Sequence, residues 1–445
     1  MADRLGQLRK HVEQMLCCNR VEDTRDWNGS RQQVIYHAPS LGSDPTGCLS
    51  RLMWPWRELF RPGNVHYPHQ WFWDSCAHAI VLSHIDLKLA KAEIEALLYS
   101  QRDDGFIPHM IWNRKRMYWR DRLNSRIYPS RYTSPYLQPP MLGEAVEAIY
   151  NKEGTGQFVN AVLPSLKRYY HYLDRKRDRS HDGLLEIIIS YESGKDRSPE
   201  YDEVYGDIKF WPLPIMRLVN KHRRLDWDLE LILANNSFRV KDLLFNCIYA
   251  QNLMAMCRLC VVADDIEAEL FRKRAEKTES SILSKMYNAD SGLFFSLDTR
   301  SGQERQLKVS TVSTLLPLIL DSISQFQIDR LVGDYLTNPA EFWADYPVPA
   351  EPLSSPKRQK LQIWRGQQTW VYTNWLIVKG LRKQGRRFPQ QERSYDSVAD
   401  TIVDKTCKLV EKEGFREYYD SETGKGCRAC NFGWSALALD MVYNR

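Results

Sequence analysis

The sequence has little that would suit a membrane-embedded, disulfide-stapled or low-complexity protein. Its longest nearly apolar stretch, around 315–320, is far shorter than the ~18 residues that a membrane span needs. The N-terminus alternates charges and lacks the apolar core of a secretory signal. Its 22 Gly and 21 Pro residues are too few for a disordered or collagen-like chain. We therefore expect a folded cytoplasmic protein with no membrane partner.

Cysteine is also sparse, with ten residues in 445, which is not the density of a disulfide scaffold. Four of the cysteines form two CxxC pairs, Cys257/Cys260 and Cys427/Cys430. Structural zinc sites place their pairs ~12–20 residues apart, and these pairs are much further apart in the chain. The first pair lies in a run that reads as a buried helix face. The sequence thus predicts no metal site, and without a phosphate loop or dinucleotide fingerprint it predicts no cofactor.

What is present is the composition of an ordinary globular protein, with 43% hydrophobic and 27% charged residues. The net charge of +6 is concentrated in one segment, 102–131, which has eight basic and three acidic residues. A local patch favours an anionic small ligand over nucleic acid, which usually needs a wider basic face. The basic residues of the segment are Arg102, Arg114, Lys115, Arg116, Arg120, Arg122, Arg126 and Arg131.

Apolar residues recur with helical spacing through most of the chain. The segments that read as helices are 86–100, 140–150, 163–173, 240–262, 266–287, 311–322, 369–384 and 394–413. Strand-like runs are few and short, and LLEIIISY at 184–191 is the best of them. No composition break marks a linker, so we expect an all-α chain that forms one domain over 1–445. The oligomeric state stays open, a homo-oligomer included.

Four loop segments carry large aromatic residues, and three of them also carry carboxylates. They are 67–79, 191–202, 363–376 and 415–437, of which 363–376 is the one without a carboxylate. Aromatic rings stack on the C–H faces of sugars, and a carboxylate can hold two sugar hydroxyls. Three of the segments also have a plainer interpretation. Asp74 can be a helix N-cap beside a Trp cluster, 191–202 a solvated acidic loop, and Glu417 a partner of Arg416 or a distant Lys. His66, His69 and His78 form no clear ligand set and read as core or surface histidines.

Taken together, the four segments favour one sugar-binding cleft. Glycoside hydrolysis needs two carboxyl groups, an acid for the leaving oxygen and a base or nucleophile opposite it, and different loops can supply them. Gly194 permits a close backbone approach in the second segment. Trp73 and Trp434 are further candidate sugar contacts, from the first and fourth segments.

The motifs WFWDSCAHA, ESGKDRSPEYD, WRG…TWVYTNWL and FREYYDSETG…NFGW, in that order, resemble those of glycoside hydrolase family 63 over roughly 64–440. The resemblance implies an (α/α)6 barrel and an inverting reaction, with Asp196 as general acid and Glu417 as general base. It also implies that Asp74 binds sugar and that six further residues line the pocket. These are Tyr67, Gln70, Trp71, Trp364, Arg365 and Trp370. This chain has Gln367-Gln368 where the family often has a proline after WRG.

Inversion requires the two carboxyls to lie ~6.5–9.5 Å apart, with a protonated acid in a drier setting than the base. The compact length resembles family members that hydrolyse mannosylglycerate or glucosylglycerate, which carry a carboxylate. We expect 102–140 to form a lid, from which an arginine can hold that carboxylate. The alternative for this segment is a solvated loop or an oligomer contact. The alternatives for function are an α-glucosidase for neutral di- or oligosaccharides and a non-catalytic helical barrel that binds sugar or nucleic acid.

Overall fold

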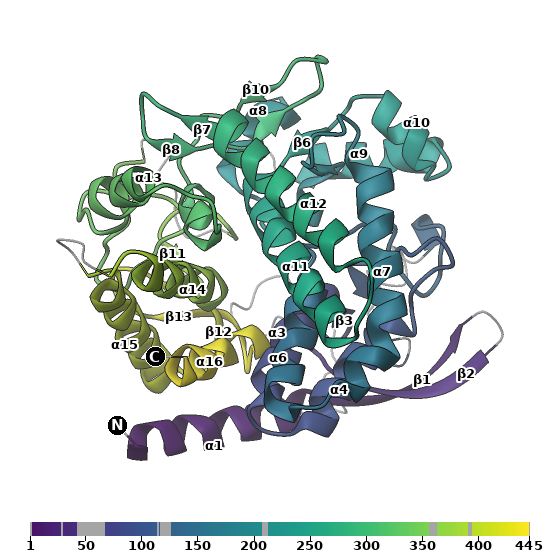
Figure 1. The fold of residues 1–445 in the computed structure, drawn as a ribbon, viewed down its shortest axis with the longest axis horizontal. Coiled ribbons are helices and arrows are strands. Elements are labelled where there is room, and N and C mark those ends of the chain that lie inside the picture. Colours follow the sequence, from purple (N-terminus) through teal and green to yellow (C-terminus); the bar gives the residue numbers. More distant parts are fainter. Residues whose placement is uncertain are drawn as a thin grey trace.

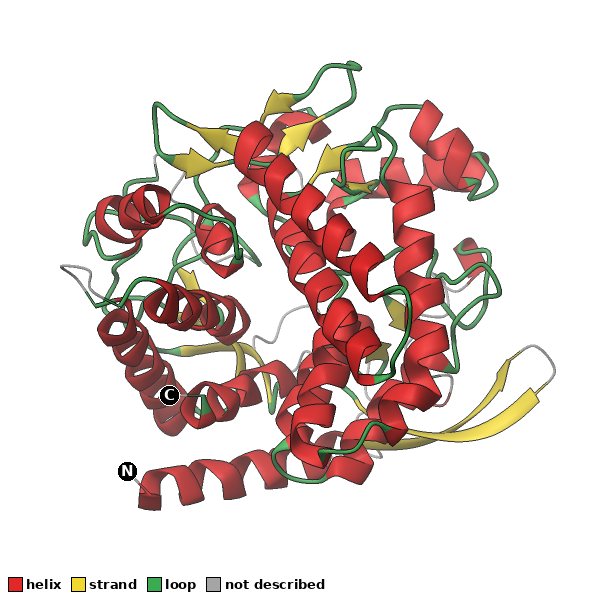
Figure 2. Cartoon of the chain, in the orientation of Figure 1, coloured by secondary structure: helices red, strands yellow, loops and turns green. Residues whose placement is uncertain are grey.

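A computed structural model describes residues 2–27, 30–41, 67–113, 115, 126–206, 212–355, 363–389 and 394–444. Helices dominate it, and the strands are short apart from two hairpins (Figure 2). Six helical elements form an inner ring in which each contacts the next and the last contacts the first. They are α3 (Phe72–Ser83), α6 (Leu142–Glu153), α11 (Leu243–Val262), η5 (Val312–Ile319), α14 (Val371–Arg387) and α16 (Leu437–Tyr443).

Each inner element has an outer partner packed against it, so the ring has two layers. The outer layer consists of α4 (Leu87–Leu98), α7 (Gln157–Arg177), α12 (Ala268–Ser281), the α13–η6 unit (Gln325–Arg330 and Leu331–Leu336), α15 (Tyr395–Glu413) and α1 (Ala2–Asn19). In Figure 1 the N-terminal α1 lies beside α16, so the two ends of the chain meet at one seam. Six inner and six outer elements make the (α/α)6 barrel that the resemblance implied.

The central helix, α11, is long and apolar enough to cross a membrane by length and composition, with a mean hydropathy of 1.2 over 18 residues. The sequence analysis expected a helix at 240–262 but did not consider it as a possible membrane span. Two thirds of this window is buried within the protein, against α6, α7, α12 and η5. Asp242 caps its first turn by accepting a hydrogen bond from the Phe245 backbone N–H at 2.8 Å. Its apolarity is therefore accounted for by the barrel core.

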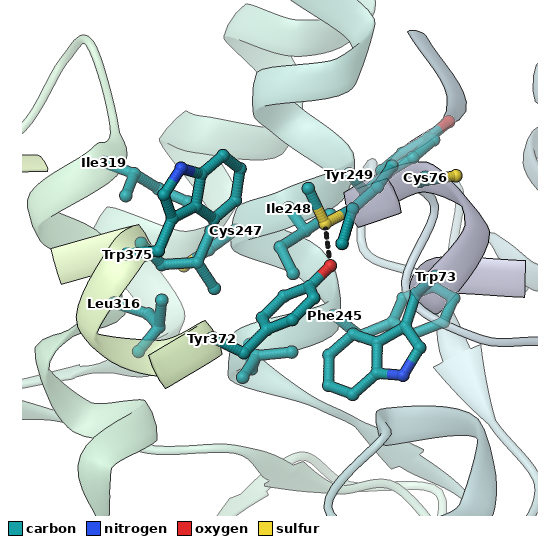
Figure 3. Close-up of a cluster of buried hydrophobic side chains, with 14 of the residues drawn as sticks. Trp73, Cys76, Phe245, Cys247, Ile248, Tyr249, Leu316, Ile319, Tyr372 and Trp375 are labelled. Atoms are coloured by element: carbon teal, nitrogen blue, oxygen red, sulfur yellow. Dashed lines mark hydrogen bonds between the residues drawn. The ribbon is translucent and has the colours of Figure 1, made fainter. Parts of the chain in front are cut away.

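Figure 3 shows how the inner elements meet in that core. Phe245, Cys247 and Ile248 of α11 lie on the side of Tyr372 and Trp375 of α14, with Trp73 of α3 against Tyr372. The Tyr249 ring points away from them, toward Tyr170. The buried Tyr372 hydroxyl donates to the Met141 sulfur, the dashed contact in the figure. One continuous hydrophobic cluster extends from Leu8 to Met441. A core of this extent is compatible with one domain, and the division of the chain into domains stays a prediction.

The strands differ most from the sequence-based expectation. Two eight-residue strands, β1 (Arg20–Trp27) and β2 (Ser30–His37), form an antiparallel hairpin that projects from the body in Figure 1. The sequence analysis missed it because its apolar residues cluster near the base. Conversely, the run at 184–191 contributes only β5 (Glu186–Ile187) before turning into η2 (Ser190–Ser193), and 311–322 forms the 3-10 helix η5.

The remaining elements connect the helices at the ends of the barrel. Short strands are β3 (Gln70–Trp71), β4 (Met110–Ile111), β6 (Val240–Lys241), β7 (Tyr287–Asn288), β8 (Leu293–Phe294), β9 (Leu297–Asp298), β10 (Arg305–Gln306) and β11 (Gln368–Thr369). Strand β11 pairs with the hairpin of β12 (Arg416–Asp420) and β13 (Gly426–Cys430). Short helical pieces are η3 (Pro199–Tyr201), α8 (Asp202–Tyr205), α9 (Pro212–Arg224), α10 (Leu229–Ala234), the π-helix η4 (Ile282–Met286) and η7 (Gly433–Ala436).

Candidate active site

The four aromatic segments of the sequence come together at one end of the barrel, where the chain enters the inner helices. Asp74 lies in the first turn of α3, Trp370 is the N-cap of α14, and Glu417 lies in β12, whose hairpin partner β13 leads to η7. Asp196 lies in the loop that follows η2. The charge of Glu417 raises the pKa of both Asp74 and Asp196, so the three carboxyls share one site.

The loop bearing Asp196 is fixed on both sides of that residue. Gly194 has a φ of 74°, and a Cβ added there would lie 2.5 Å from the Trp73 ring, so glycine is required by conformation and by space. Lys195 is buried, and its ammonium contacts the carboxylates of Glu200 and, at 3.1 Å, Asp242. These contacts tie the loop to the cap of α11.

Asp196 itself is partly buried, and desolvation raises its pKa from 3.8 to about 7. The charges of Arg197 and Arg428 oppose this shift, and the charge of Glu417 adds to it. A carboxyl with a pKa near neutrality is protonated often enough to deliver a proton to a leaving oxygen.

Glu417 is 4% exposed and has a donor at each carboxylate oxygen. The Tyr67 hydroxyl donates to its Oε1 at 3.0 Å, and the Ala429 N–H donates to its Oε2 at 3.4 Å. The Arg428 Nε lies 3.3 Å from Oε2. Burial raises the pKa of Glu417, while Arg428 and the two hydrogen bonds lower it. The partner of Glu417 is thus Arg428, because Arg416 instead donates to the Glu413 carbonyl at 2.9 Å.

These environments correct one expectation. The sequence analysis placed the general acid in the drier setting, but Glu417 is the more buried of the two carboxyls. The pKa of Asp196 nevertheless reaches about 7, whereas at Glu417 burial still raises the pKa but Arg428 and the two hydrogen bonds counter part of that rise. The donors around Glu417, rather than dryness alone, therefore distinguish the two groups.

Asp74 is 3% exposed, and burial raises its pKa from 3.8 to about 8. The nearby charges of Glu417, Glu93 and Asp196 add to the shift. At neutral pH the group is therefore mainly a neutral acid, able both to donate and to accept a hydrogen bond. Such a group suits a pair of sugar hydroxyls.

Four tryptophans that we expected at the sugar site form a stacked cluster. Trp364 lies parallel to Trp370 with ring centroids 3.9 Å apart, and Trp434 meets Trp370 edge-on at 5.5 Å. Trp73 meets Trp434 edge-on at 5.7 Å. The exposed fractions of all four are 6% or less. The four rings pack on one another, and direct sugar contact by any of them stays a prediction.

The other predicted pocket residues divide between holding the site and facing it. Gln70 donates to the Ser75 hydroxyl at 3.0 Å and is fully buried. Arg365 pairs with Asp202 through both guanidinium Nη atoms. Trp71 is half-buried, and its indole N–H has no partner in the described structure. Because an enclosed N–H favours a partner, Trp71 offers a donor to a ligand.

Comparison with known proteins identifies the family of this chain. A family model described as the mannosylglycerate hydrolase MGH1-like glycoside hydrolase domain matches residues 67–435. The chain belongs to this family. The matched span contains three of the four segments and all but the last two residues of the fourth.

Among curated relatives of this family member, a mannosylglycerate hydrolase of Thermus thermophilus is 28% identical over 425 residues, covering 86% of this chain and 96% of that protein. A glucosylglycerate hydrolase of Mycolicibacterium hassiacum is 24% identical, covering 84% of this chain and 91% of that one. A crystal structure of a GH63 mannosylglycerate hydrolase from Thermus thermophilus, in complex with Tris and D-glycerate, matches with a TM-score of 0.77 and 25% identity. That match covers 98% of this chain and all of the other.

The segment expected to form a lid, 102–140, is described only in part in this MGH1-like domain. Residue 114 and residues 116–125, which include Arg114, Arg116, Arg120 and Arg122, lie outside the described residues. The described flanks are built into the body: β4 pairs with β3, and Thr133 bridges to Ile111. Arg102 stacks on Phe106, 4.4 Å from the ring centroid. A lid role for this segment stays a prediction.

Histidines and cysteines form no cluster of three or more metal-binding side chains within the described residues. His78 is fully buried next to Gly433, and His37 pairs with Glu93 at 2.8 Å. His66 lies outside the described residues. Cys257 and Cys260 lie on α11, as the helical interpretation of that run expected.

The sequence analysis missed two residues that shape the site, Arg428 and Lys195. Arg428 lies in the segment 415–437, yet only the pairing of β12 with β13 places it opposite Glu417. The turn residues between EYYD and CRAC could have indicated that hairpin. Lys195 lies between Gly194 and Asp196, and a lysine in an acidic loop gave no sign of being buried.

Proposed function

We propose that this protein is an inverting glycosidase that hydrolyses a small α-glycoside of glycerate, with Asp196 as general acid and Glu417 as general base. The observation that carries the proposal is a pair of carboxyls from different loops with different environments. One has a pKa of about 7, and the other is held by Tyr67 and Arg428. An acid and a base of this kind are what inversion uses.

In the reaction, Asp196 protonates the glycosidic oxygen as the bond to the anomeric carbon breaks. Glu417 accepts a proton from water, which attacks the opposite face of the ring. Asp74 and the Trp71 N–H suit the hydroxyls of the non-reducing sugar. The step needs no cofactor, because the two carboxyls supply and receive the proton.

The substrate class draws support from the relatives, which are named for mannosylglycerate and glucosylglycerate, and from the charge of the site. Burial lowers the pKa of Arg197, and the positive charges of Arg428 and Arg365 lower it further. The three guanidinium groups therefore lie close together. Guanidinium groups close to the general acid suit an anionic glycerate, although Arg428 also pairs with Glu417 and Arg365 with Asp202. Described residues of the 102–131 segment that could add to it are Lys115, Arg126 and Arg131, which are exposed. The family member is proposed to act in the cytoplasm on a small-molecule substrate.

Proton NMR of fresh digests tests the proposal with mannosylglycerate, glucosylglycerate, trehalose and α-linked glucobioses. We expect cleavage of a glycerate glycoside with the β-anomer of the sugar appearing first. Mannosylglycerol and glucosylglycerol, which lack only the carboxylate, are the matched control substrates. Equal rates with and without the carboxylate would favour a neutral α-glucoside or α-mannoside instead. An α-anomer appearing first would contradict inversion and the role of Glu417 as base.

A matched protein control is Asp196→Asn, which keeps the size of the side chain but cannot donate an acidic proton. We expect its turnover to fall by about 10²–10⁴-fold. Unchanged turnover would remove Asp196 from the mechanism. A folded wild-type protein that cleaves none of the panel would favour a sugar-binding barrel.

A further inference from the structure

The hairpin that carries Glu417 contains a β-bulge directly opposite that residue. Tyr418 pairs with Cys427 and Arg416 pairs with Cys430, so two residues, Arg428 and Ala429, face the single Glu417. Arg428 has a φ of 58°, in the left-handed region that few non-glycine residues adopt. A strained residue of this kind at a candidate site suggests that its side chain is needed there.

The bulge brings the Arg428 side chain into a closed triangle with Tyr67 and Glu417. Its Nη2 donates to the Tyr67 hydroxyl at 3.1 Å, and its Nε lies 3.3 Å from Glu417 Oε2. The Tyr67 hydroxyl in turn donates to Oε1 at 3.0 Å. A guanidinium has donors only, so it fixes the direction in which the Tyr67 proton points. Both oxygens of Glu417 are thereby held in one orientation.

Burial would otherwise disfavour the ionised form of Glu417, because desolvation raises its pKa. Asp74 of α3 and Asp196 of the loop after η2 share the desolvated site, and the charge of Glu417 raises the pKa of both, so the three carboxyls compete for protons. Tyr67, from the segment before β3, opposes the effect of burial by donating a hydrogen bond to Glu417. Among the described residues, Arg428 is the cation whose charge lowers the pKa of both Glu417 and Asp196. It contacts Glu417 directly, whereas Asp196 also has Arg197.

We propose that Arg428 is a positioning residue for Glu417, whose guanidinium orients the carboxylate and keeps it ionised. This inference rests on the proposed function, because it assigns Glu417 the role of base. It explains how the more buried of the two carboxyls can be the one that accepts a proton. The bulge then has a purpose, since a regular strand would place one residue opposite Glu417 instead of two.

The test compares Arg428→Gln and Arg428→Lys with wild type in the pH dependence of kcat/KM on mannosylglycerate. Arg428→Gln should move the acidic limb upward by about one pH unit, so activity at pH 5 falls about tenfold more than at pH 7. Arg428→Lys keeps the charge and should keep the limb in place, but it loses the fork and lowers kcat. Lys425→Gln removes the same charge from the exposed turn of this hairpin and should change neither.

A purely structural role would lower kcat/KM by the same factor at every pH, and that result would overturn the proposal. An infrared titration of ¹³C-carboxyl-labelled protein, as the difference between wild type and Glu417→Gln, follows the ionisation of Glu417 without substrate. Repeating this difference in the Arg428→Gln background should raise its midpoint. If wild type cleaves no glycoside, the proposed function fails, while this titration still decides what Arg428 does. An unchanged midpoint in folded Arg428→Gln would overturn the inference by itself.

Discussion

The clearest quantitative consequence of the site is the alkaline limit of its activity. Burial places the pKa of Asp196 at about 7 instead of 3.8, so about half of the molecules carry the acidic proton at pH 7. With the ordinary pKa the protonated fraction would be about one in 1,600. The environment therefore supplies about 800-fold more of the acid form at neutral pH, which corresponds to about 4 kcal/mol. Above pH 7 we expect kcat/KM to fall about tenfold per pH unit.

The perturbation that tests this reasoning is Arg197→Gln. The Arg197 charge stabilises ionised Asp196, so removing it should raise the pKa of Asp196 and move the alkaline limb to higher pH. Glu417 has its own contact with Arg428, so the acidic limb should stay in place. The assay is kcat/KM on mannosylglycerate from pH 4 to 9 under first-order conditions, with Arg305→Gln, an exposed position, as the charge-matched control. An alkaline limb that stays put, or moves downward, would refute the assignment of that limb to Asp196.

Three further predictions concern the parts that hold the site. Gly194→Ala places a methyl group against the Trp73 ring at positive φ, and urea unfolding should show a loss of about 1–3 kcal/mol together with lower kcat. Lys195→Met leaves the buried carboxylates of Glu200 and Asp242 unpaired and should cost about 3–5 kcal/mol by the same assay, whereas Lys195→Arg should cost less. Burial raises the pKa of Asp74 to about 8 in the folded protein. The stability that protonated Asp74 contributes in acid is therefore lost as the pH rises from about 4 to 8. Asp74→Asn should therefore gain on wild type by up to about 1.4 kcal/mol per pH unit over that range, and a constant difference between pH 5 and 8 would contradict the shift.

Much of the barrel could be predicted from the chain because its helices are strongly periodic and well capped. Helix α4 was expected at 86–100 and spans Leu87–Leu98, with Asp86 capping it through the Lys88 N–H at 2.9 Å. The expectation failed where local pattern and tertiary structure disagree. The apolar run at 184–191 is buried by its surroundings on all sides, so its sequence cannot separate a strand from a turn of 3-10 helix.

The candidate site was predicted as a set of residues rather than as an arrangement. Aromatic and carboxylate-bearing loops indicated Asp74 and Glu417, and the family resemblance assigned Asp196 and Glu417 their roles. The sequence analysis expected the acid to be the more buried carboxyl, whereas Glu417 is the deeper of the two, because depth depends on how β12 pairs with β13 and β11. The same pairing decides that Arg428, and not the adjacent Arg416, reaches Glu417.

The way the barrel closes explains why these contacts lie outside the reach of local sequence reasoning. Tyr67 and Glu417 are 350 residues apart in the chain, and their 3.0 Å contact lies where α3 meets α16, the first and last inner elements. The donor that orients the base thus comes from the beginning of the barrel, and the base with its arginine comes from the end. Glu417 acquires its full set of donors only when the ring is closed. A barrel open at this seam would leave Glu417 without the Tyr67 hydroxyl, and Arg428 without the acceptor that fixes its orientation.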